Sequence, residues 1–500
     1  MTDAWDRFKS AAEDLENLGS AIKLANWDQE VMMPVKGGEG RARVLATLQA
    51  LAHERLTDPR LGDLLDELGN DADLDAVQSA SVRIMKKHYD RATRVPEALV
   101  RELAELEATA FQAWTRARPA NDFSILEPYL TKMLALKKEQ ADAIGWEGER
   151  YDALLDEYEP DMKTAEIEAM FEDLEVSLRP IVDKVVEAAG EPPSFVDRPF
   201  DSAKQKFFSD WLVQELGFDT AAGRLDTSPH PFTMPIGPGD VRQTTKMVEN
   251  ELMMSLYATI HETGHALYEQ NLPPELGRLP AGQVPSLGLH ESQSRLWENQ
   301  VGRSHPFCGF LFTKLSEMFP AETKDIDADL FYRGASHPQR TLIRITADEL
   351  TYNLHVALRF QLELAMFRDD LDVADLPGAW NEGMQRWVGI TPPTDSEGVM
   401  QDMHWSIGAL GYFPTYTLGT LYAAAFFEKA EADLGSLTSD LAKGDTTRLF
   451  DWLKANVFSQ AYLYPAKELG QRILGAPLEA APFIDYLKKK YGELYDVTLD

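Results

Sequence analysis

The sequence is poor in cysteine, because its 500 residues include only Cys308. A single thiol excludes a disulfide within the chain, and we interpret Cys308 as a buried, apolar-type residue rather than a nucleophile. Long apolar runs are also missing: no stretch of about 18 uncharged apolar residues could span a membrane, and the first residues carry no segment typical of a signal peptide. We therefore expect a cytoplasmic protein without a membrane partner.

Basic residues are scarce relative to acidic ones. Lys and Arg number 49 against 82 Asp and Glu, which leaves a net charge of -33. Such a chain repels nucleic acid and anionic membranes, so we exclude both as partners. Hydrophobic residues make up 44% of the chain and can build a large core. Because no repeat, low-complexity linker or sharp change in composition divides it, we expect one domain over 1–500, in which about 1–190 can form a helical cap.

Helical periodicity dominates the chain, so we predict a mainly α fold. The one good candidate for strands is 231–245, where Gly237-Pro-Gly can turn a short hairpin directly ahead of a long helix. Prolines and helix-start signals set the expected boundaries. The predicted helices are 3–25, 39–69, 75–91, 96–116, 125–144, 148–157, 164–189, 201–216, 245–271, 287–302, 307–318, 339–368, 378–387, 415–435, 446–455 and 480–493.

The helix predicted over 245–271 contains the motif His261-Glu-Thr-Gly-His265. Residues four apart lie on one face of a helix, so both imidazoles can bind one metal ion. Glu262 is rotated away from that pair and can take a proton from an attacking water. Two neutral imidazoles beside a carboxylate are what zinc-assisted hydrolysis requires, although two buried core histidines are the alternative interpretation.

A catalytic zinc site requires a third protein ligand. The downstream carboxylates Glu269, Glu275, Glu291 and Glu298 are the candidates. Glu269 lies one turn further along the same helix, usually too far to complete a tetrahedron. A hairpin of two packed helices would place Glu291 opposite the histidines. Glu298 lies on the same face of that second helix, so the residues alone favour Glu291 only modestly.

Amide hydrolysis also requires donors for an oxyanion and, at a peptide's C-terminus, a cation for the free carboxylate. The glycine-spaced aromatic run 401–419 offers His404, Tyr412 and Tyr416, and His230 precedes the hairpin. Core aromatics beside a turn are the alternative interpretation of this run. Arg344 and Arg242 are the candidate anchors. Arg344 can equally pair with Asp348 at i+4 in the predicted helix 339–368.

Taken together, these segments make the chain similar to the carboxypeptidase Taq family of thermostable metallocarboxypeptidases. The resemblance extends over nearly the whole chain, and several ordered motifs carry it. These are Trp27-Asp-Gln-Glu, Gly223-Arg-Leu-Asp, His230-Pro-Phe, Asp240-x-Arg-x-Thr244, His261-Glu-Thr-Gly-His265, His290-Glu-Ser-Gln-Ser294, Ile343-Arg-Ile-Thr-Ala-Asp-Glu349, Gln401-Asp-Met-His-Trp405 and Tyr412-Phe-Pro-Thr-Tyr416.

The resemblance implies an almost all-helical fold with a deep substrate groove, as in gluzincin peptidases of the oligopeptidase type. It implies a homodimer and a metal, zinc or alternatively cobalt, held by His261, His265 and Glu291. It also implies Glu262 as general base. The remaining roles that it implies are His230, His404 and Tyr416 near the scissile carbonyl and Arg344 as carboxylate anchor; we add Tyr412 and Arg242 as substrate-binding residues.

The predicted activity is therefore metal-dependent removal of single C-terminal amino acids from peptides with a free C-terminus, with broad specificity. An endo-oligopeptidase or dipeptidyl carboxypeptidase with the same metal centre is the first alternative. A peptide-binding scaffold without catalysis is the second. Glu262 argues against the scaffold, because metal binding alone has no need of that carboxylate.

Overall fold

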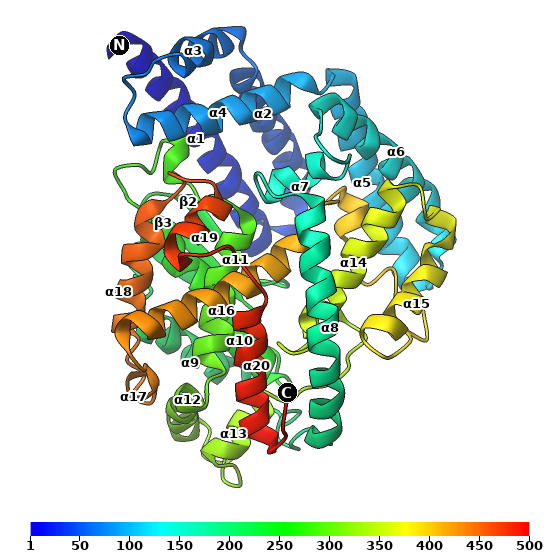
Figure 1. Ribbon diagram of the computed structural model, residues 1–500, viewed down its shortest axis with the longest axis vertical. Helices are drawn as coiled ribbons and strands as arrows, with labels where there is room; N and C mark the ends of the chain where they lie inside the picture. The colour runs from blue at the N-terminus through cyan, green and yellow to red at the C-terminus, as the bar shows by residue number, and fades with distance from the viewer. Residues whose placement is uncertain (1, 500) are drawn as a thin grey trace.

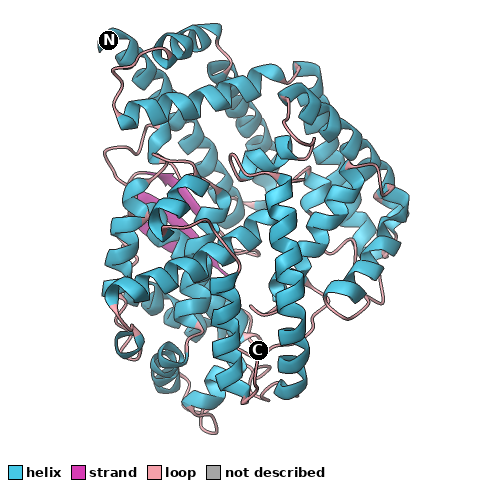
Figure 2. Ribbon diagram, in the orientation of Figure 1, coloured by secondary structure: helices cyan, strands magenta, loops and turns pink. Residues whose placement is uncertain are grey.

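The computed structural model describes residues 2–499, which form many helices and one small sheet (Figure 1; Figure 2). The predicted mainly α fold is confirmed. The helices are α1 (Thr2–Val31), α2 (Gly38–Leu56), α3 (Pro59–Gly69), α4 (Ala76–Arg94), α5 (Glu97–Ala120), α6 (Glu127–Ile144), α7 (Asp152–Tyr158), α8 (Thr164–Ala189), α9 (Ser202–Glu215), α10 (Leu252–Gln270), α11 (Leu287–Arg295), α12 (His305–Met318), α13 (Ala328–Ala335), α14 (Tyr352–Phe367), α15 (Leu376–Trp387), α16 (Pro414–Leu434), α17 (Thr438–Leu441), α18 (Thr447–Asn456), α19 (Ala466–Leu474) and α20 (Ala481–Tyr495).

The N-terminal helices α1 to α4 lie together at the top of Figure 1 and share a small apolar cluster around Phe8, Leu65 and Met85. The predicted helix 39–69 is wrong in one respect, because it is interrupted between α2 and α3 and forms two helices. Pro59 occupies the first turn of α3, where a missing N–H costs nothing. The side chain of Asp58 accepts a hydrogen bond from the Arg60 backbone and caps the new helix.

Two larger apolar clusters form the rest of the core, and α16 contributes to both. Leu418 and Leu421 belong to the cluster built with α5 to α8, α14 and α15. Tyr422 and Phe426 belong to the cluster built with α9 to α13 and α18. A helix that is apolar on nearly all sides is expected to be buried. The middle of α16 is therefore buried between the two clusters. Cys308 is buried in the second cluster as predicted.

The sheet lies at the left of the molecule, next to α10, and Figure 2 shows its strands among helices. Its strands are β1 (Gly223–Thr227), β2 (Thr233–Gly237) and β3 (Asp240–Thr245), in the order β1-β3-β2. The predicted hairpin is confirmed as the antiparallel pair β2–β3, whose turn uses Gly239 at φ +78°. The parallel strand β1 is an addition to the prediction.

Two predicted helices begin later than expected. Helix α10 begins at Leu252 rather than 245, because the preceding backbone makes other bonds: the Val248 N–H donates to Ser255, and the Glu249 carbonyl accepts from Phe200. The predicted helix 339–368 begins only at Tyr352. Asp348 stops it earlier, since its carboxylate accepts from the backbone N–H groups of Gln339, Leu350 and Thr351.

A groove of about 510 Å³ separates the N-terminal helices from the segment ahead of α11. Its wall includes Lys87 and Arg91 from α4, Tyr158 at the end of α7, and Ser286. The Tyr158 ring packs edge-on against Tyr412 with ring centroids 5.1 Å apart, so the groove leads toward the aromatic run found in the sequence.

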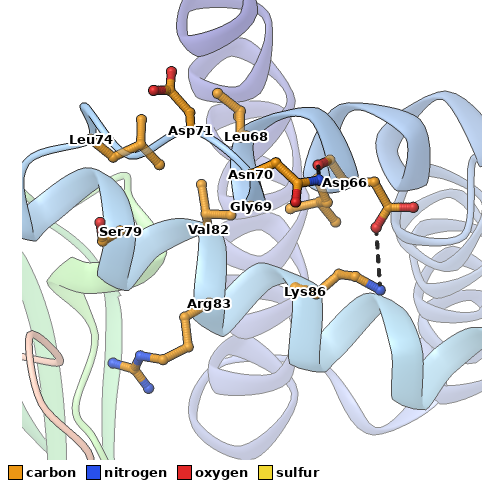
Figure 3. A pocket seen from close by; sticks show the side chains of 11 residues that line it. Asp66, Leu68, Gly69, Asn70, Asp71, Leu74, Ser79, Val82, Arg83 and Lys86 are labelled. Carbon is orange, nitrogen blue, oxygen red and sulfur yellow. Dashed lines mark hydrogen bonds and ion pairs between the residues drawn. The ribbon is translucent and has the colours of Figure 1, made fainter.

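A second hollow of about 440 Å³ lies between α3 and α4 (Figure 3). Lys86 extends from α4 toward Asp66 on α3, with 3.7 Å between the charged atoms. None of the site residues predicted above lines this hollow, so we do not assign the chemistry to it. Within residues 2–499, every helix is too short or too polar to cross a bilayer.

Candidate metal centre

Helix α10 carries the His-Glu-x-x-His motif and packs tightly against α11. A Cβ atom on Gly264 would lie 2.7 Å from the Gln293 carbonyl oxygen and 2.7 Å from the Ser294 Cα. Both are backbone atoms that cannot move aside, so glycine is the residue that lets α11 come this close. The glycine inside the motif, which costs helix propensity, therefore sets the spacing of the two helices.

The close approach brings Glu291 of α11 to the two histidines of α10. Its Oε2 lies 3.4 Å from His265 Nε2 and 3.6 Å from His261 Nε2. Two ligand atoms that are each about 2.1 Å from a tetrahedral ion are about 3.4 Å apart. These spacings fit a metal ion without rearrangement. Within residues 2–499, this is the one group of three His, Cys, Asp or Glu side chains compact enough to hold an ion.

The surroundings set the charge of the three donor groups. Burial opposes protonation of His261, but the carboxylates of Glu291 and Glu298 raise the pKa of His261 above its usual value. The Glu298 carboxylate lies 2.9 Å from His261 Nδ1, which directs the proton to Nδ1 and leaves Nε2 for the ion. Burial lowers the pKa of His265 to about 3, so this imidazole is neutral near pH 7. Burial opposes ionisation of Glu291, yet Arg295 and the histidines hold the pKa of Glu291 well below its usual range.

Glu262 projects from the same helix and is nearly buried, with 7% of its surface exposed. The Thr233 hydroxyl, on β2, lies 2.7 Å from Glu262 Oε2. Burial raises the pKa of Glu262 above its usual range, while the Thr233 hydrogen bond acts in the opposite direction. A carboxylate with a raised pKa beside a metal position is suited to accept and return a proton.

The aromatic run predicted to supply donors lies at the start of α16 and in the turn before it. His404 Nε2 is 3.4 Å from the Tyr416 hydroxyl, and the Tyr412 and Tyr416 rings meet edge-on at 5.3 Å. Burial and the neighbouring Arg344 lower the pKa of His404 to about 4. Burial raises the pKa of Tyr416 well above its usual value. Near pH 7 the imidazole is thus neutral and the phenol keeps its proton.

Arg344 is buried in an ion cluster rather than paired with Asp348. Its Nη2 lies 2.8 Å from Asp402 Oδ1, and its Nη1 lies 2.8 Å from the Tyr352 hydroxyl. Arg359 pairs with the other oxygen of the same carboxylate at 2.6 Å. The predicted i+4 pair with Asp348 is wrong, because residues 339–351 contain only a short 3₁₀ turn, Arg344–Thr346, and the α-helix begins at Tyr352. Two buried guanidinium groups share one carboxylate, so the cluster carries a surplus positive charge.

A sequence model of the family described as "Carboxypeptidase Taq (M32) metallopeptidase" matches residues 7–491. The chain belongs to this family. It is 43% identical over 491 residues to "Thermostable carboxypeptidase 1" of Thermus thermophilus, with 96% of each chain covered. It is 36% identical over 483 residues to "Carboxypeptidase 1" of Bacillus subtilis, again with 96% of each chain covered.

Solved structures agree with this assignment. The M32 carboxypeptidase from Deinococcus radiodurans R1 superimposes with a TM-score of 0.96 at 38% identity, covering 99% of this chain and 100% of that one. The Pyrococcus furiosus carboxypeptidase gives 0.96 at 34% identity, with 98% and 99% covered. The predicted class of activity is confirmed: the protein is a metal-dependent carboxypeptidase, a peptide hydrolase that acts at the C-terminus.

Two candidate residues of this metallocarboxypeptidase, His230 and Arg242, make contacts of their own. His230 is exposed. Its backbone carbonyl, rather than its ring, accepts a hydrogen bond from the Ser228 hydroxyl. Arg242 pairs with Asp240 at 2.8 Å, and its guanidinium lies over the Trp27 ring, 4.2 Å from the centroid. Within residues 2–499, neither side chain forms a hydrogen bond or ion pair with His261 or His265.

The other three carboxylates that the sequence offers as a third metal ligand in this metallocarboxypeptidase face other groups. Glu269 lies 3.0 Å from His290 Nε2, and Glu275 is exposed in the loop after α10. Glu298 contacts His261 through Nδ1 instead of facing the ion position. It lies in the π-helical segment η4 (Leu296–Gly302), where the wider turn shifts it from its expected α-helical direction.

Sequence reasoning missed three residues that shape this site. Thr233 follows His230-Pro-Phe directly and could have been found as a hydroxyl in the strand beside the metal helix. Asp402 stands inside the Gln401-Asp-Met-His-Trp405 motif, although no role was assigned to it. Arg359 gave no local signal, because only the fold brings α14 to the 401–405 turn.

Proposed function

We propose that this metallocarboxypeptidase releases single amino acids from peptides, with His261, His265 and Glu291 as ligands and Glu262 as general base. The main support is that the three ligand atoms lie within 4.8 Å of one another, with Glu262 next to the first of them in sequence. A divalent ion held there would acidify a water molecule and polarise a peptide carbonyl. We propose zinc, with cobalt as the alternative, because both accept nitrogen and oxygen ligands.

The chain's own residues then move one proton. Glu262 takes a proton from the attacking water while the water oxygen forms a bond to the last peptide carbonyl carbon. The carbonyl oxygen becomes an oxyanion. When the carbon–nitrogen bond breaks, Glu262 returns its proton to the leaving amine, which departs as the free amino acid. The near-complete burial of Glu262 supports this role, because proton transfer is most effective from a carboxylate with a raised pKa.

Tyr416 and His404 are the proposed donors to the oxyanion, with His230 as a further donor. The raised pKa of Tyr416 supports its part, since the phenol keeps its proton at neutral pH and can donate it in a hydrogen bond. Neutral His404 can donate from one ring nitrogen. Tyr412, packed against Tyr416 and Tyr158, would contact the substrate.

Arg344 is the proposed anchor for the C-terminal carboxylate, with Arg242 as the second candidate. The surplus positive charge of Arg344 and Arg359 around Asp402 supports this choice, because a substrate carboxylate would neutralise it. Anchoring the last residue beyond the scissile bond limits cleavage to one residue at a time.

A pair of peptides that differ only in the C-terminal group tests the substrate end. We expect the free acid to lose residues one by one and the amide to be cleaved at least about 100-fold more slowly, measured by mass spectrometry. Equal cleavage of the two peptides would contradict carboxylate anchoring and favour an endo-oligopeptidase. Release of dipeptides would favour a dipeptidyl carboxypeptidase.

The Glu262→Gln variant tests the general base. We expect it to bind metal as the wild type does and to lose several orders of magnitude in kcat. Substantial remaining activity would remove Glu262 from this role. Metal analysis of protein purified without added metal distinguishes zinc from cobalt, and added chelator should abolish activity in either case.

We further propose a cytoplasmic homodimer with one catalytic domain over residues 1–500 and the N-terminal helices as its cap. The single cysteine suits a reducing compartment. The position of α4 along the groove wall supports the role of about 1–190 as a cap. Sedimentation of the purified protein tests the homodimer.

A further inference from the structure

Thr233 is the hydrogen-bond donor to the Glu262 side chain among residues 2–499. Its Oγ1 lies 2.7 Å from Glu262 Oε2 and 2.9 Å from the Glu262 backbone oxygen. That backbone oxygen lies inside α10 and already accepts the N–H four residues on, as in any α-helix. The carboxylate is the better acceptor because it is charged. The single hydroxyl proton is therefore directed to Oε2.

We propose that Thr233 is a positioning residue that makes the two oxygens of Glu262 inequivalent. With Oε2 tied to the sheet, Oε1 is the oxygen that receives the proton from water and returns it to the leaving amine. The carboxylate then needs no rotation between the two transfers. This proposal rests on the proposed role of Glu262 as general base.

The sheet is a rigid support for this hydroxyl. Thr233 pairs with Gln243 in the antiparallel register of β2 and β3. The Gln243 side-chain oxygen in turn lies 3.2 Å from the hydroxyl of Thr263, the residue after Glu262, and this hydroxyl also lies 2.7 Å from the Thr259 carbonyl oxygen. The sheet and α10 are thus also in contact next to the hydrogen bond between Thr233 and Glu262. A donor on a free loop would lack this support.

Threonine serves this purpose better than a longer polar residue. Its hydroxyl is only one bond from Cβ, and the branched Cβ restricts χ1, so the donor has little freedom to move. Because Thr233 neither ligates the metal nor takes the proton, its loss should affect the rate more than substrate binding. Misplacing a catalytic group by about 1 Å can cost about 100-fold in rate.

The variants Thr233→Val and Thr233→Ser test the proposal. Valine keeps the shape and removes the hydroxyl, so we expect kcat to fall about 10- to 100-fold, with KM within about twofold and full metal content. Serine restores the hydroxyl, so we expect kcat within about threefold of the wild type. Kinetics on a free-acid peptide, metal analysis and thermal unfolding are measured for each variant.

Thr245→Val is the matched control. Its hydroxyl also joins the sheet to α10, 2.9 Å from Thr259 Oγ1, but not to Glu262. Thr259 keeps its bonds to Ser255 and Ser209, so we expect unchanged kinetics. Wild-type kcat in Thr233→Val, or an equal loss in Thr233→Ser, would overturn the proposal. An active Glu262→Gln enzyme would instead overturn the proposed general base, so the two failures are distinguishable.

Discussion

Glu291 lies in α11 and Glu298 lies in its π-helical continuation. Both side chains are carboxylates, yet they face different groups. Glu291 points at the histidine Nε2 atoms, where the ion would bind. Glu298 contacts His261 Nδ1 and also pairs with Arg295 and Arg303. Glu298 is therefore placed to orient His261, which we propose as a ligand, rather than to bind the metal itself.

We predict that Glu298→Gln lowers metal affinity by about 10- to 100-fold, because a ligand histidine loses its charged partner. Competition with a chelator measures the change. Asp329→Asn is the control, since Asp329 makes a similar bond of 2.8 Å to His305 on an exposed surface. Its affinity should equal that of the wild type. Unchanged affinity in Glu298→Gln would mean that the contact does not tune the site.

Residues of the site differed in how far the sequence revealed them. The two histidines could be paired because a helix fixes their relation, whichever fold surrounds it. Glu291 and Glu298 could not be separated by spacing, since both were expected on one face of one helix. The π-helical turn gives the two side chains different directions, and no sequence pattern predicts that turn. Arg344 stays a predicted anchor, and its partner Asp402 lies far along the chain, so spacing could not reveal the pair.

At the scale of elements, the metal centre depends on three helices that touch through glycine. Gly264 of α10 faces the backbone of α11, and Gly419 of α16 faces Glu291 itself. A Cβ on Gly419 would lie 2.5 Å from Glu291 Cγ and 2.6 Å from its Cβ. Glu291, the proposed third ligand, thus packs directly against α16 at a position where that helix has no side chain.

We predict that Gly419→Ala displaces Glu291 and lowers both metal affinity and kcat by at least about tenfold, because overpacking a tight contact forces atoms apart. Gly309→Ala is the matched control in α12, where a Cβ meets nothing within 4 Å. That change should leave activity intact and stabilise the protein by up to about 1 kcal/mol. Chelator competition, kinetics and thermal unfolding test both, and normal metal binding by Gly419→Ala would contradict the prediction.

Elements stabilised by local signals were predicted well, and those set by distant contacts were not. The β2–β3 hairpin follows from its own turn. Strand β1 pairs with β3 in parallel, which requires a connection that no short pattern specifies. The late start of α14 depends on Asp348, a single capping carboxylate that helical periodicity alone conceals.

For the whole molecule, the net charge of -33 is the dominant electrostatic property. Repulsion among like charges opposes the compact state, and salt screens it. We predict that raising NaCl from about 0.05 to 0.5 M raises the thermal midpoint at pH 7, although it weakens individual ion pairs. The effect should shrink near the isoelectric point of about 4.7. A midpoint that falls with salt at pH 7 would show that ion pairs outweigh the repulsion.

Glu159 joins the N-terminal half of the molecule to the helices that carry the site. It follows α7, and its Oε1 accepts from the Gly288 N–H at 2.5 Å and from Thr415 Oγ1 at 2.9 Å. These donors lie in the first turns of α11 and α16. A carboxylate at two helix N-termini is favourably placed, yet burial raises the pKa of Glu159 to about 7.

This raised pKa makes a contribution to stability that falls as pH rises. Between the ordinary value of 4.5 and about 7, the folded protein holds a proton that the unfolded chain releases. Glu159→Gln is neutral throughout and can keep both hydrogen bonds through its amide oxygen. We therefore predict that, as pH rises from 4.5 to 7.5, the free energy of unfolding of the variant increases by about 3 kcal/mol relative to that of the wild type. Denaturant unfolding of both proteins across this range measures the difference, in which the titration of the metal site cancels. Parallel curves for the two proteins would show that folding leaves the pKa of Glu159 unchanged, so that its hydrogen-bond donors fully offset the effect of burial.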